Sequence, residues 1–374
     1  MMTTGRRTLC LLITACLLVL GGLSGCQPAP SANDQSLQLS PQLRRAADQF
    51  LLKAEQLRVE KADVGTRLKS ELSADHYAEA ETLLTTLDRD DRADPRYEFV
   101  YRDALDAVSS CDAPDDSMER PLLAMEDAQS RSAWPHMLLG HYYESMACHA
   151  RGAGWARDVN QDQWNTMGNF DRRAYAEYQE ALAINPALFP VYDGLLEIAN
   201  GLGDLQQITA IYQQSREHLP DSYLLAADYM NALKPRWHGT YNQMDQFANL
   251  MRKQVKSNPR FYDLGGYVFA DRADWAYRNK DYGAALQLYS QALDYGDYPT
   301  WLKWAAESAD GARAYPEAWV YYQRYLAYKP LDAAAQKRWH EFDVFCRTPL
   351  PPACRGDRGY PWGGEVLPDS GTRP

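Results

Sequence analysis

The sequence predicts an all-α fold, a solenoid built from about eight helix pairs with little or no β-sheet. Apolar residues recur at helical spacing from Pro41 onward. A four-position pattern also repeats at intervals of 33 or 34 residues, as expected of an array of helix pairs. Alternating runs of Val, Ile and Thr, which are typical of strands, are nearly absent.

The first 25 residues are predicted to be a secretory signal peptide that is removed from the mature protein. Two arginines precede an apolar run at residues 9–20, which is shorter than the ~20 residues that a membrane-spanning helix needs. Small residues at positions 24 and 25 then precede Cys26. This segment resembles the lipobox of bacterial lipoprotein precursors. The resemblance implies cleavage before Cys26 and attachment of a diacylglycerol and a further acyl chain, such as palmitate, at that residue.

The residues after the predicted lipidated cysteine indicate which membrane retains the protein and predict a flexible linker. Gln27 occupies the position at which an Asp would hold an enterobacteria-like lipoprotein in the inner membrane, so it favours the outer membrane, facing the periplasm. Residues 26–40 are rich in Pro, Ser, Ala and Gln and are expected to form a flexible tether of roughly 20 Å. A helical repeat domain is predicted over 41–345, followed by a Pro/Gly-rich tail over 346–374.

The repeat combines a small or apolar residue, a mostly aromatic residue four positions later, a third residue three further on, and a proline at offset 12. The clearest copies are Ala174/Tyr178/Ala181/Pro186, Ile208/Tyr212/Ser215/Pro220, Ala285/Tyr289/Ala292 and Ala318/Tyr322/Tyr325/Pro330, with weaker copies at Ala80/Leu84/Leu87 and Phe247/Met251/Gln254/Pro259. A small residue allows close helix approach, the aromatic ring fills the groove, and proline ends the helix. The pattern resembles the second helix of tetratricopeptide repeats, and we expect the four tyrosines to be buried wedges.

A longer segment narrows the resemblance to one family. Its elements are Gly140-His141-Tyr142-Tyr143, Ala150-Arg151-Gly152, Trp164, the Ala174 repeat, and Lys234-Pro235-Arg236-Trp237-His238-Gly239-Thr240 with Met244 and Phe247-Ala248 beyond. Over roughly residues 121–254 the chain is similar to a bacterial family of uncharacterised function, the DUF4034-type domain. Members carry an Arg-Trp-Gly-Gly-Ser segment, from which His238 and Thr240 depart. The resemblance implies an all-helical repeat domain and brings no known activity.

Four cysteines remain in the predicted mature chain: Cys111, Cys148, Cys346 and Cys354. An even count in an exported protein predicts two disulfides, and three pairings are open. Cys346 and Cys354 bracket a short Pro-rich loop that can close on itself, which leaves Cys111 and Cys148 for each other.

Charge and motifs argue against several classes of function. The net charge of −11 disfavours nucleic acid as a partner. No nucleotide-binding, nucleophile-elbow or zinc-protease motif is present in the sequence, so we expect no catalytic residue, no nucleotide and no cofactor. His141, Glu144 and Cys148 share a helix face that could suit zinc, but oxidation of Cys148 and the lack of a second His there favour no metal. The many carboxylates leave a glycosidase-like pair open without nominating one.

Aromatic residues outside the repeat stripe are the candidate binding residues. Among 25 Tyr and 10 Trp, Trp155 and Trp164 lie in a Gly/Asn/Gln-rich connection. Arg236, Trp237 and His238 lie in an insert that lengthens one repeat to 39 residues. An insert on one face of a repeat array is often its binding face, and Arg and Trp are enriched in interface hot spots. The alternative, that Trp237 fills a gap created by the longer repeat, stays open.

Together these observations predict a lipid-anchored scaffold of the cell envelope. An acidic, aromatic-rich concave surface of the repeats is expected to hold a peptide or helix of another envelope protein. The alternative is an envelope enzyme or glycan-binding protein that acts on cell-wall or capsular polysaccharide, for which aromatic platforms and scattered carboxylates would also serve.

Overall fold

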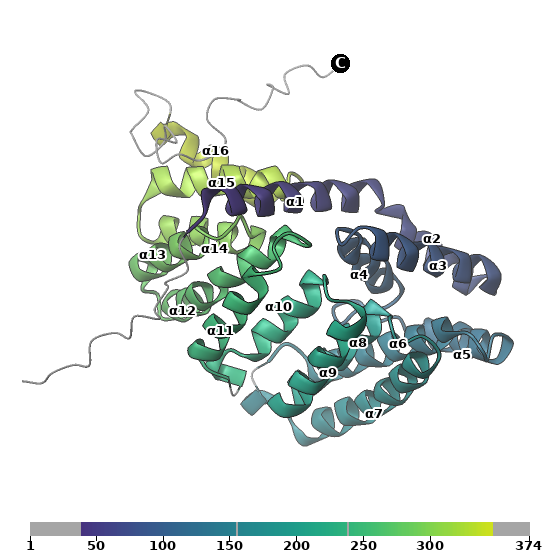
Figure 1. Ribbon diagram of the computed structural model, residues 1–374. Coiled ribbons are helices and arrows are strands. Elements are labelled where there is room, and N and C mark those ends of the chain that lie inside the picture. Colours follow the sequence, from purple (N-terminus) through teal and green to yellow (C-terminus); the bar gives the residue numbers. More distant parts are fainter. Residues whose placement is uncertain (1–38, 155, 238, 347–374) are drawn as a thin grey trace, which may run out of the picture. The chain divides into compact units, whose positions relative to one another are not determined.

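The computed structural model describes residues 39–154, 156–237 and 239–346, and within them the chain forms sixteen α-helices, four 3-10 helices and no strand (Figure 1). The predicted all-α class is confirmed. The α-helices are α1 (Pro41–Glu60), α2 (Asp63–Ser73), α3 (Tyr77–Ala93), α4 (Tyr97–Val108), α5 (Glu119–Ala128), α6 (Ala133–Arg151), α7 (Gln161–Ile184), α8 (Phe189–Leu202), α9 (Leu205–His218), α10 (Tyr223–Ala232), α11 (Tyr241–Arg252), α12 (Tyr267–Arg278), α13 (Tyr282–Ala292), α14 (Pro299–Gly311), α15 (Tyr315–Tyr328) and α16 (Ala333–Cys346).

The short 3-10 helices are η1 (Asp116–Met118), η2 (Ala156–Asp158), η3 (Pro235–Trp237) and η4 (Pro259–Gly266). The predicted signal peptide with Cys26, most of the tether, and the tail beyond 346 lie outside the described residues. No helix in the described ranges is both long and apolar enough to cross a membrane.

Local signals explain where the helices begin and end. The Ser40 hydroxyl accepts a hydrogen bond from the Leu43 amide and Pro41 occupies the first turn, so α1 begins at the predicted residue. Asn160 and Gln163 form a reciprocal capping box at the start of α7. Helix α8 ends at Leu202 and is capped by Gly203, whose φ of 73° glycine adopts without strain.

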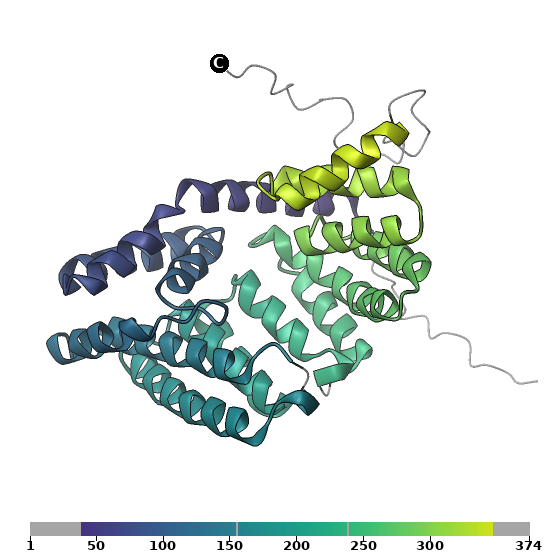
Figure 2. The same cartoon turned by 180° about the vertical axis from the view of Figure 1, so that it is seen from behind.

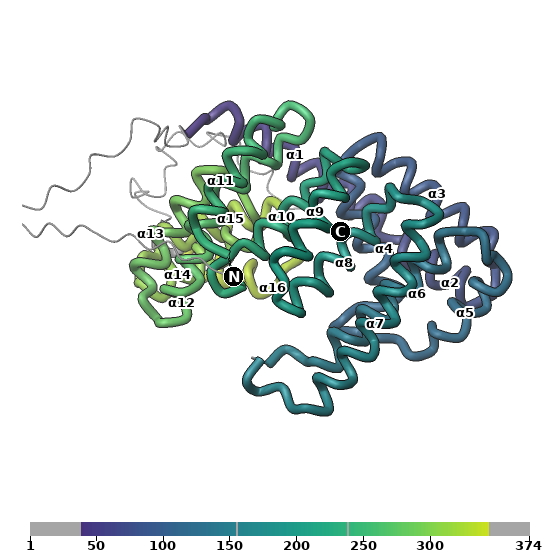
Figure 3. Tube along the Cα trace, turned by 60° about the horizontal axis from the view of Figure 1, so that its bottom comes forward, coloured from purple at the N-terminus to yellow at the C-terminus, as the bar shows by residue number. Residues whose placement is uncertain are grey.

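Consecutive helices pack in pairs, and the second helix of each pair carries the sequence repeat. Pairs form between α6 and α7, α8 and α9, α12 and α13, and α14 and α15. Figure 3 shows α6 and α7 running side by side. The four predicted wedges, Tyr178, Tyr212, Tyr289 and Tyr322, are all buried. The repeat pattern therefore marks the core face of α7, α9, α13 and α15, as predicted.

Tyr178 shows how such a wedge is accommodated. A Cβ atom added at Gly140 of α6 or at Gly194 of α8 would collide with the Tyr178 side chain, so two glycines allow both helices to close around it. The Tyr178 hydroxyl passes through this gap and donates a hydrogen bond of 2.7 Å to Glu144 Oε2. A buried tyrosine of the repeat pattern thus contacts a carboxyl group at the far end of its ring.

Helix α1 adds an arrangement that the repeat pattern does not predict. It packs against α4, η4 and α15, and so joins the early helices to the late ones (Figures 1 and 2). Ion pairs support this contact, between Arg44 and Asp297 at 3.2 Å and between Lys329 and Glu55 at 2.6 Å. These ion pairs join residues more than 240 positions apart along the chain. The repeat pattern, in contrast, predicts contacts only between neighbouring helix pairs.

Candidate functional site

A hollow of about 700 Å³ lies between α6, α7, the end of α8, η3 and the end of α12. We call it the aromatic hollow. Its lining comprises Glu144, Cys148, Arg151, Ala153, Gly154, Ala156, Trp164, Met167, Asp171, Glu197, Ile198, Asn200, Gly201, Arg236, Trp237 and Arg278. It brings together Trp164 with Arg236 and Trp237, which the sequence nominated in two separate segments. Trp155 and His238, nominated with them, lie outside the described residues.

Neither tryptophan of the hollow is a buried packing residue. Trp237 is 37% exposed, and Trp164 is half-buried with the Arg151 guanidinium 5.9 Å from its ring centroid. Arg236 pairs with Asp271, with Nη2 and Oδ1 3.3 Å apart, which fixes the arginine at the edge of the hollow. The exposure of Trp237 favours the binding interpretation of the insert over the gap-filling alternative.

The insert is a tight turn that holds these side chains outward. The amides of Trp237 and Gly239 both donate to the Lys234 carbonyl oxygen, at 2.8 and 3.3 Å. A Cβ atom at Gly239 would collide with the backbone of Leu233, so only glycine permits this approach. The extra residues of the long repeat therefore form a defined turn that depends on Gly239, and they are not an irregular loop.

The wall of the aromatic hollow contains polar oxygens without partners. Asp171 of α7 is only 8% exposed, and its Oδ2 has no hydrogen-bond partner among the described residues. The same holds for Oδ1 of Asn200 at the end of α8. Burial, together with the like charge of Glu197, raises the pKa of Asp171 to about 6. Both free atoms are acceptors, so this wall is suited to a group that donates hydrogen bonds.

A smaller inner cavity of about 190 Å³ adjoins the aromatic hollow and shares Glu144, Cys148 and Glu197 with it. Its lining comprises Arg102, Leu105, Asp106, Cys111, His141, Glu144, Ser145, Cys148, Phe189, Pro190, Asp193, Glu197 and Asp228. Arg102 of α4 reaches across to α8 and α10, where it pairs with Asp193 at 2.5 Å and Asp228 at 2.9 Å. One guanidinium of α4 therefore holds acidic side chains from two other helices.

The surroundings of the inner cavity favour protonated acids and a neutral histidine. Burial raises the pKa of Glu144 well above its ordinary value, and the charge of Glu197 adds to this effect. Desolvation and the charge of Asp193 raise the pKa of Glu197 in turn. Burial lowers the pKa of His141, whose Nε2 lies 2.9 Å from the Ser109 carbonyl oxygen. Carboxyl groups of this kind can hold or accept a proton near neutral pH.

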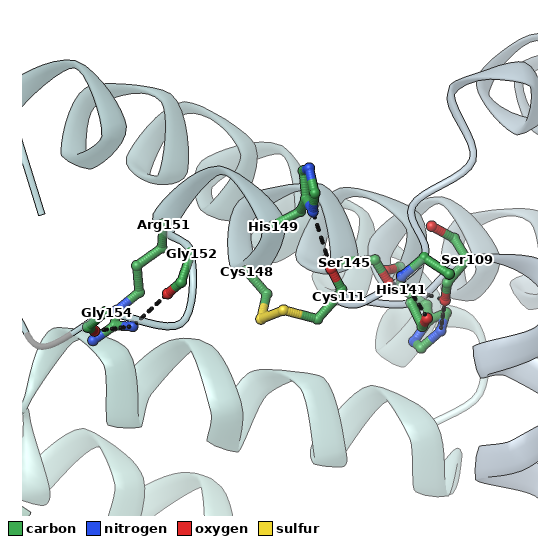
Figure 4. The surroundings of a disulfide bond; sticks show 11 residues. Ser109, Cys111, His141, Ser145, Cys148, His149, Arg151, Gly152 and Gly154 are labelled. Atoms are coloured by element: carbon green, nitrogen blue, oxygen red, sulfur yellow. Dashed lines mark hydrogen bonds between the residues drawn. A yellow bond between two sulfur atoms is a disulfide. The ribbon is translucent and has the colours of Figure 1, made fainter.

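The predicted disulfide between Cys111 and Cys148 is present, with the two Cα atoms 5.2 Å apart (Figure 4). His149 Nδ1 and the Cys111 carbonyl oxygen lie 3.1 Å apart, and the Ser145 hydroxyl donates to the Ser109 carbonyl oxygen at 3.1 Å, so hydrogen bonds also hold the loop after α4 to α6. Because its sulfur is bonded, Cys148 cannot serve as a zinc ligand beside His141 and Glu144. The predicted Cys346–Cys354 pair lies outside the residues whose side chains are described.

Sequence reasoning missed the acidic inner cavity because its members come from α4, α6, α8 and α10. One signal was available, since Asp193 and Glu197 are four residues apart and so share a helix face. It also missed a set of ligand atoms on three helices, Glu126, His136 and Glu177, which lie within 4.8 Å of one another. In that set His136 Nδ1 is 2.8 Å from Glu177 Oε2, so an ion would have to displace this hydrogen bond.

Comparison with known families assigns part of the chain. Residues 66–218 match the model of a domain of unknown function, DUF4034. This confirms the resemblance read from the sequence and shifts its extent from 121–254 to the segment from α2 to α9. The matched residues include Glu144, Trp164, Asp171 and Glu197, whereas Trp237 lies beyond them. A search of curated proteins finds no match to the chain.

Proposed function

We propose that this chain, whose residues 66–218 match DUF4034, is a lipid-anchored envelope protein that binds a peptide segment of another envelope protein in the aromatic hollow. One observation carries the proposal. Trp164 and Trp237, 73 residues apart in sequence, line a single hollow instead of filling the core. Tryptophan and arginine at the edge of a concave surface are the residue types that dominate peptide and protein recognition.

The dimensions and chemistry of the hollow support a peptide-sized occupant. Its volume of about 700 Å³ falls within the range of roughly 300–1,000 Å³ that is typical of ligand sites. Met167 and Ile198 supply apolar contact, while Asp171 and Asn200 offer hydrogen-bond acceptors. A mixture of aromatic anchors and a few oriented polar groups is what gives such sites their specificity.

The anchoring part of the proposal rests on the signal anatomy and on Cys26. Cys26→Ala is expected to leave the precursor uncleaved and without the mobility shift that acylation causes. Fractionation of cells and gel mobility measure this directly. Normal processing and membrane retention of the variant would contradict lipid anchoring.

The binding part is tested by the double change Arg236→Ala with Trp237→Ala, and by Trp237→Ala alone, because Arg236 also holds Asp271. Crosslinking in the native envelope, followed by recovery of the partner, should fall about tenfold or more, as expected for a hot-spot residue. Circular dichroism and melting of the single variant should stay close to wild type. Trp275→Ala is the matched control, because Trp275 is 70% exposed on α12 and is not part of the hollow's lining.

A loss of binding that only follows a drop of several degrees in melting temperature would show that Trp237 is a packing residue. The binding face would then be sought along the connection between Trp155 and Trp164.

The inner cavity favours one alternative, an enzyme or glycan-binding protein that acts on cell-wall or capsular polysaccharide. Glu144 and Glu197 face one cavity and both have raised pKa values, as a general acid requires. Glu197→Gln discriminates between the two functions. A hydrolase would lose turnover of peptidoglycan or capsular fragments while still binding them, whereas a peptide scaffold would show no turnover in either form.

A further inference from the structure

We propose that the aromatic hollow selects a basic side chain, arginine or lysine, of the bound peptide, and that Asp171, assisted by Glu197, binds its cationic nitrogen. This inference rests on the proposed function and adds the chemical class of the residue that enters the hollow. Its basis is the juxtaposition of a buried carboxylate that lacks a partner with two accessible tryptophans and an acidic inner cavity.

Asp171 is the carboxylate of the hollow for which a ligand would supply the missing hydrogen-bond donor. A buried acceptor without a hydrogen bond destabilises the folded state, and a ligand that supplies the donor recovers this loss on binding. Oδ2 of Asp171 has no such donor in the part of the chain that the structure describes. Asn200 Oδ1, in the same lining and equally without a partner, can accept a second hydrogen bond from a forked guanidinium.

Among the other buried carboxylates of the described residues, all but Asp91 have a hydrogen-bond partner on at least one oxygen. Asp263 is bonded to Arg260, and Glu98 accepts hydrogen bonds from the amides of Tyr223 and Leu224. Asp91 resembles Asp171 in having a buried oxygen without a partner, but it does not line the hollow. The lack of a partner therefore coincides with an accessible hollow at Asp171, and Asp91 offers a matched control.

The charges around Asp171 favour a cation over an anion. The charge that acts on Asp171 is that of Glu197, which has the same sign. Two of the three arginine side chains that line the hollow are engaged elsewhere: Arg236 pairs with Asp271, and Arg151 donates to the Gly152 and Gly154 carbonyl oxygens. A cation that enters the hollow therefore meets a wall in which Asp171 has no cationic partner from its own chain among the described residues.

The remaining walls fit the rest of a basic side chain. Trp237 is exposed enough to place its ring against a guanidinium or ammonium group, an interaction for which tryptophan is the best aromatic partner. Met167 and Ile198 provide apolar surface for the methylene stem. A neutral peptide would use the aromatic and apolar walls but would leave Asp171 without its donor.

The experiment measures binding of short peptides to the full mature protein by isothermal titration and ligand-observed NMR. The probes are Gly-Gly-Arg-Gly-Gly, its lysine counterpart, and the citrulline peptide, which has the shape of arginine without the charge. We expect the arginine or lysine peptide to bind about tenfold or more tightly than the citrulline peptide. Asp171→Asn should remove most of that difference while leaving citrulline binding unchanged.

Matched variants separate this inference from the proposed function. Asp91→Asn should leave all affinities unchanged, and Trp237→Ala should weaken binding of every peptide. Equal binding of charged and neutral peptides, or no effect of Asp171→Asn, would overturn the inference while the peptide-binding function stands. Peptides that fail to bind, together with cell-wall fragments that bind in a Trp237-dependent manner, would overturn both.

Two further outcomes are decisive. Free putrescine that binds as tightly as the arginine peptide would identify a small diamine as the occupant and would overturn the choice of a peptide. Should Asp171→Asn melt well below wild type, Glu197→Gln provides the second test. It should weaken binding of the arginine peptide more than that of the citrulline peptide, and equal weakening of both would contradict the inference.

Discussion

Asp297, which lies under α1, has basic partners on two sides, whereas Asp171 in the wall of the aromatic hollow has none among the described residues. Asp297 accepts hydrogen bonds from Arg44 at 3.2 Å and from Arg324, and its own amide donates to Asp48 at 2.6 Å. Burial alone would raise the pKa of Asp297, but the two arginines outweigh burial and lower that pKa. At Asp171 burial acts without such compensation, and the pKa rises.

This difference separates two uses of buried charge. Where a carboxylate is matched by cations of its own chain, it holds helices together, here α1 with the segments around α14 and α15. Where it is left unmatched in the wall of a hollow, its desolvation remains uncompensated until a ligand arrives. The first region should therefore respond to mutation in stability, and the second in binding.

The largest effect is expected at Asp297. Asp297→Ala removes the carboxylate shared by Arg44 and Arg324 and takes an anionic partner from each buried guanidinium group, so the free energy of unfolding should fall by about 3–5 kcal/mol. Denaturant unfolding measures this. Arg67→Ala is the control, since its ion pair with Asp63 is exposed and should be worth less than about 1 kcal/mol. Similar losses for both variants would show that the network under α1 does not hold the fold.

The disulfide next to the hollow should contribute somewhat less. Reduction of Cys111–Cys148, or its replacement by two alanines, opens a loop of 37 residues and should cost about 3–4 kcal/mol by chain-entropy arithmetic. Thermal melting with and without a reductant tests this. An unchanged melting temperature would mean that the disulfide adds no stability beyond that of the hydrogen bonds between this loop and α6.

Tyr178→Phe should have an intermediate effect, because it keeps the wedge and removes only the hydroxyl. Glu144 then loses its 2.7 Å hydrogen bond inside a buried site, which should cost about 1–3 kcal/mol. Tyr212→Phe is the comparison, since the Tyr212 hydroxyl donates to a methionine sulfur at 3.5 Å, a weaker acceptor than a carboxylate, and its loss should be smaller. Equal losses of stability at both positions would contradict a stabilising role for the hydrogen bond between Tyr178 and Glu144.

Asp171→Asn should not destabilise the protein and should even stabilise it at neutral pH. The pKa of Asp171 is raised from 3.8 to about 6 on folding, so its ionisation opposes folding as pH rises through that window. The difference in free energy of unfolding between Asp171→Asn and wild type should therefore be near zero below pH 4. It should then increase in favour of the variant up to about pH 6. Unfolding of both proteins across this range measures the difference, and a flat difference would contradict an unpaired Asp171.

The repeat stripe was predictable because each copy lies within one helix. Positions such as Ala174, Tyr178 and Ala181 share a face by helical periodicity alone, and that face is buried. The closure by α1 was not predictable, since Arg44 meets Asp297 across more than 250 residues and no local pattern records that contact. The hollow was predicted in part. Trp164 and Trp237 were distinctive as residue types, but Asp171 looks like any polar residue of a helix until the tertiary packing buries it.

The central claim is that the aromatic hollow is the binding surface and that it receives a basic side chain. The most direct measurement places a photo-crosslinking amino acid at position 237, and in parallel at position 275, in cells that carry the native envelope. We expect position 237 to crosslink to one peptide segment of an envelope protein, with an arginine or lysine beside the attachment point, and position 275 not to do so. Crosslinks from position 237 that match those from 275, or that attach only to polysaccharide, would contradict this claim.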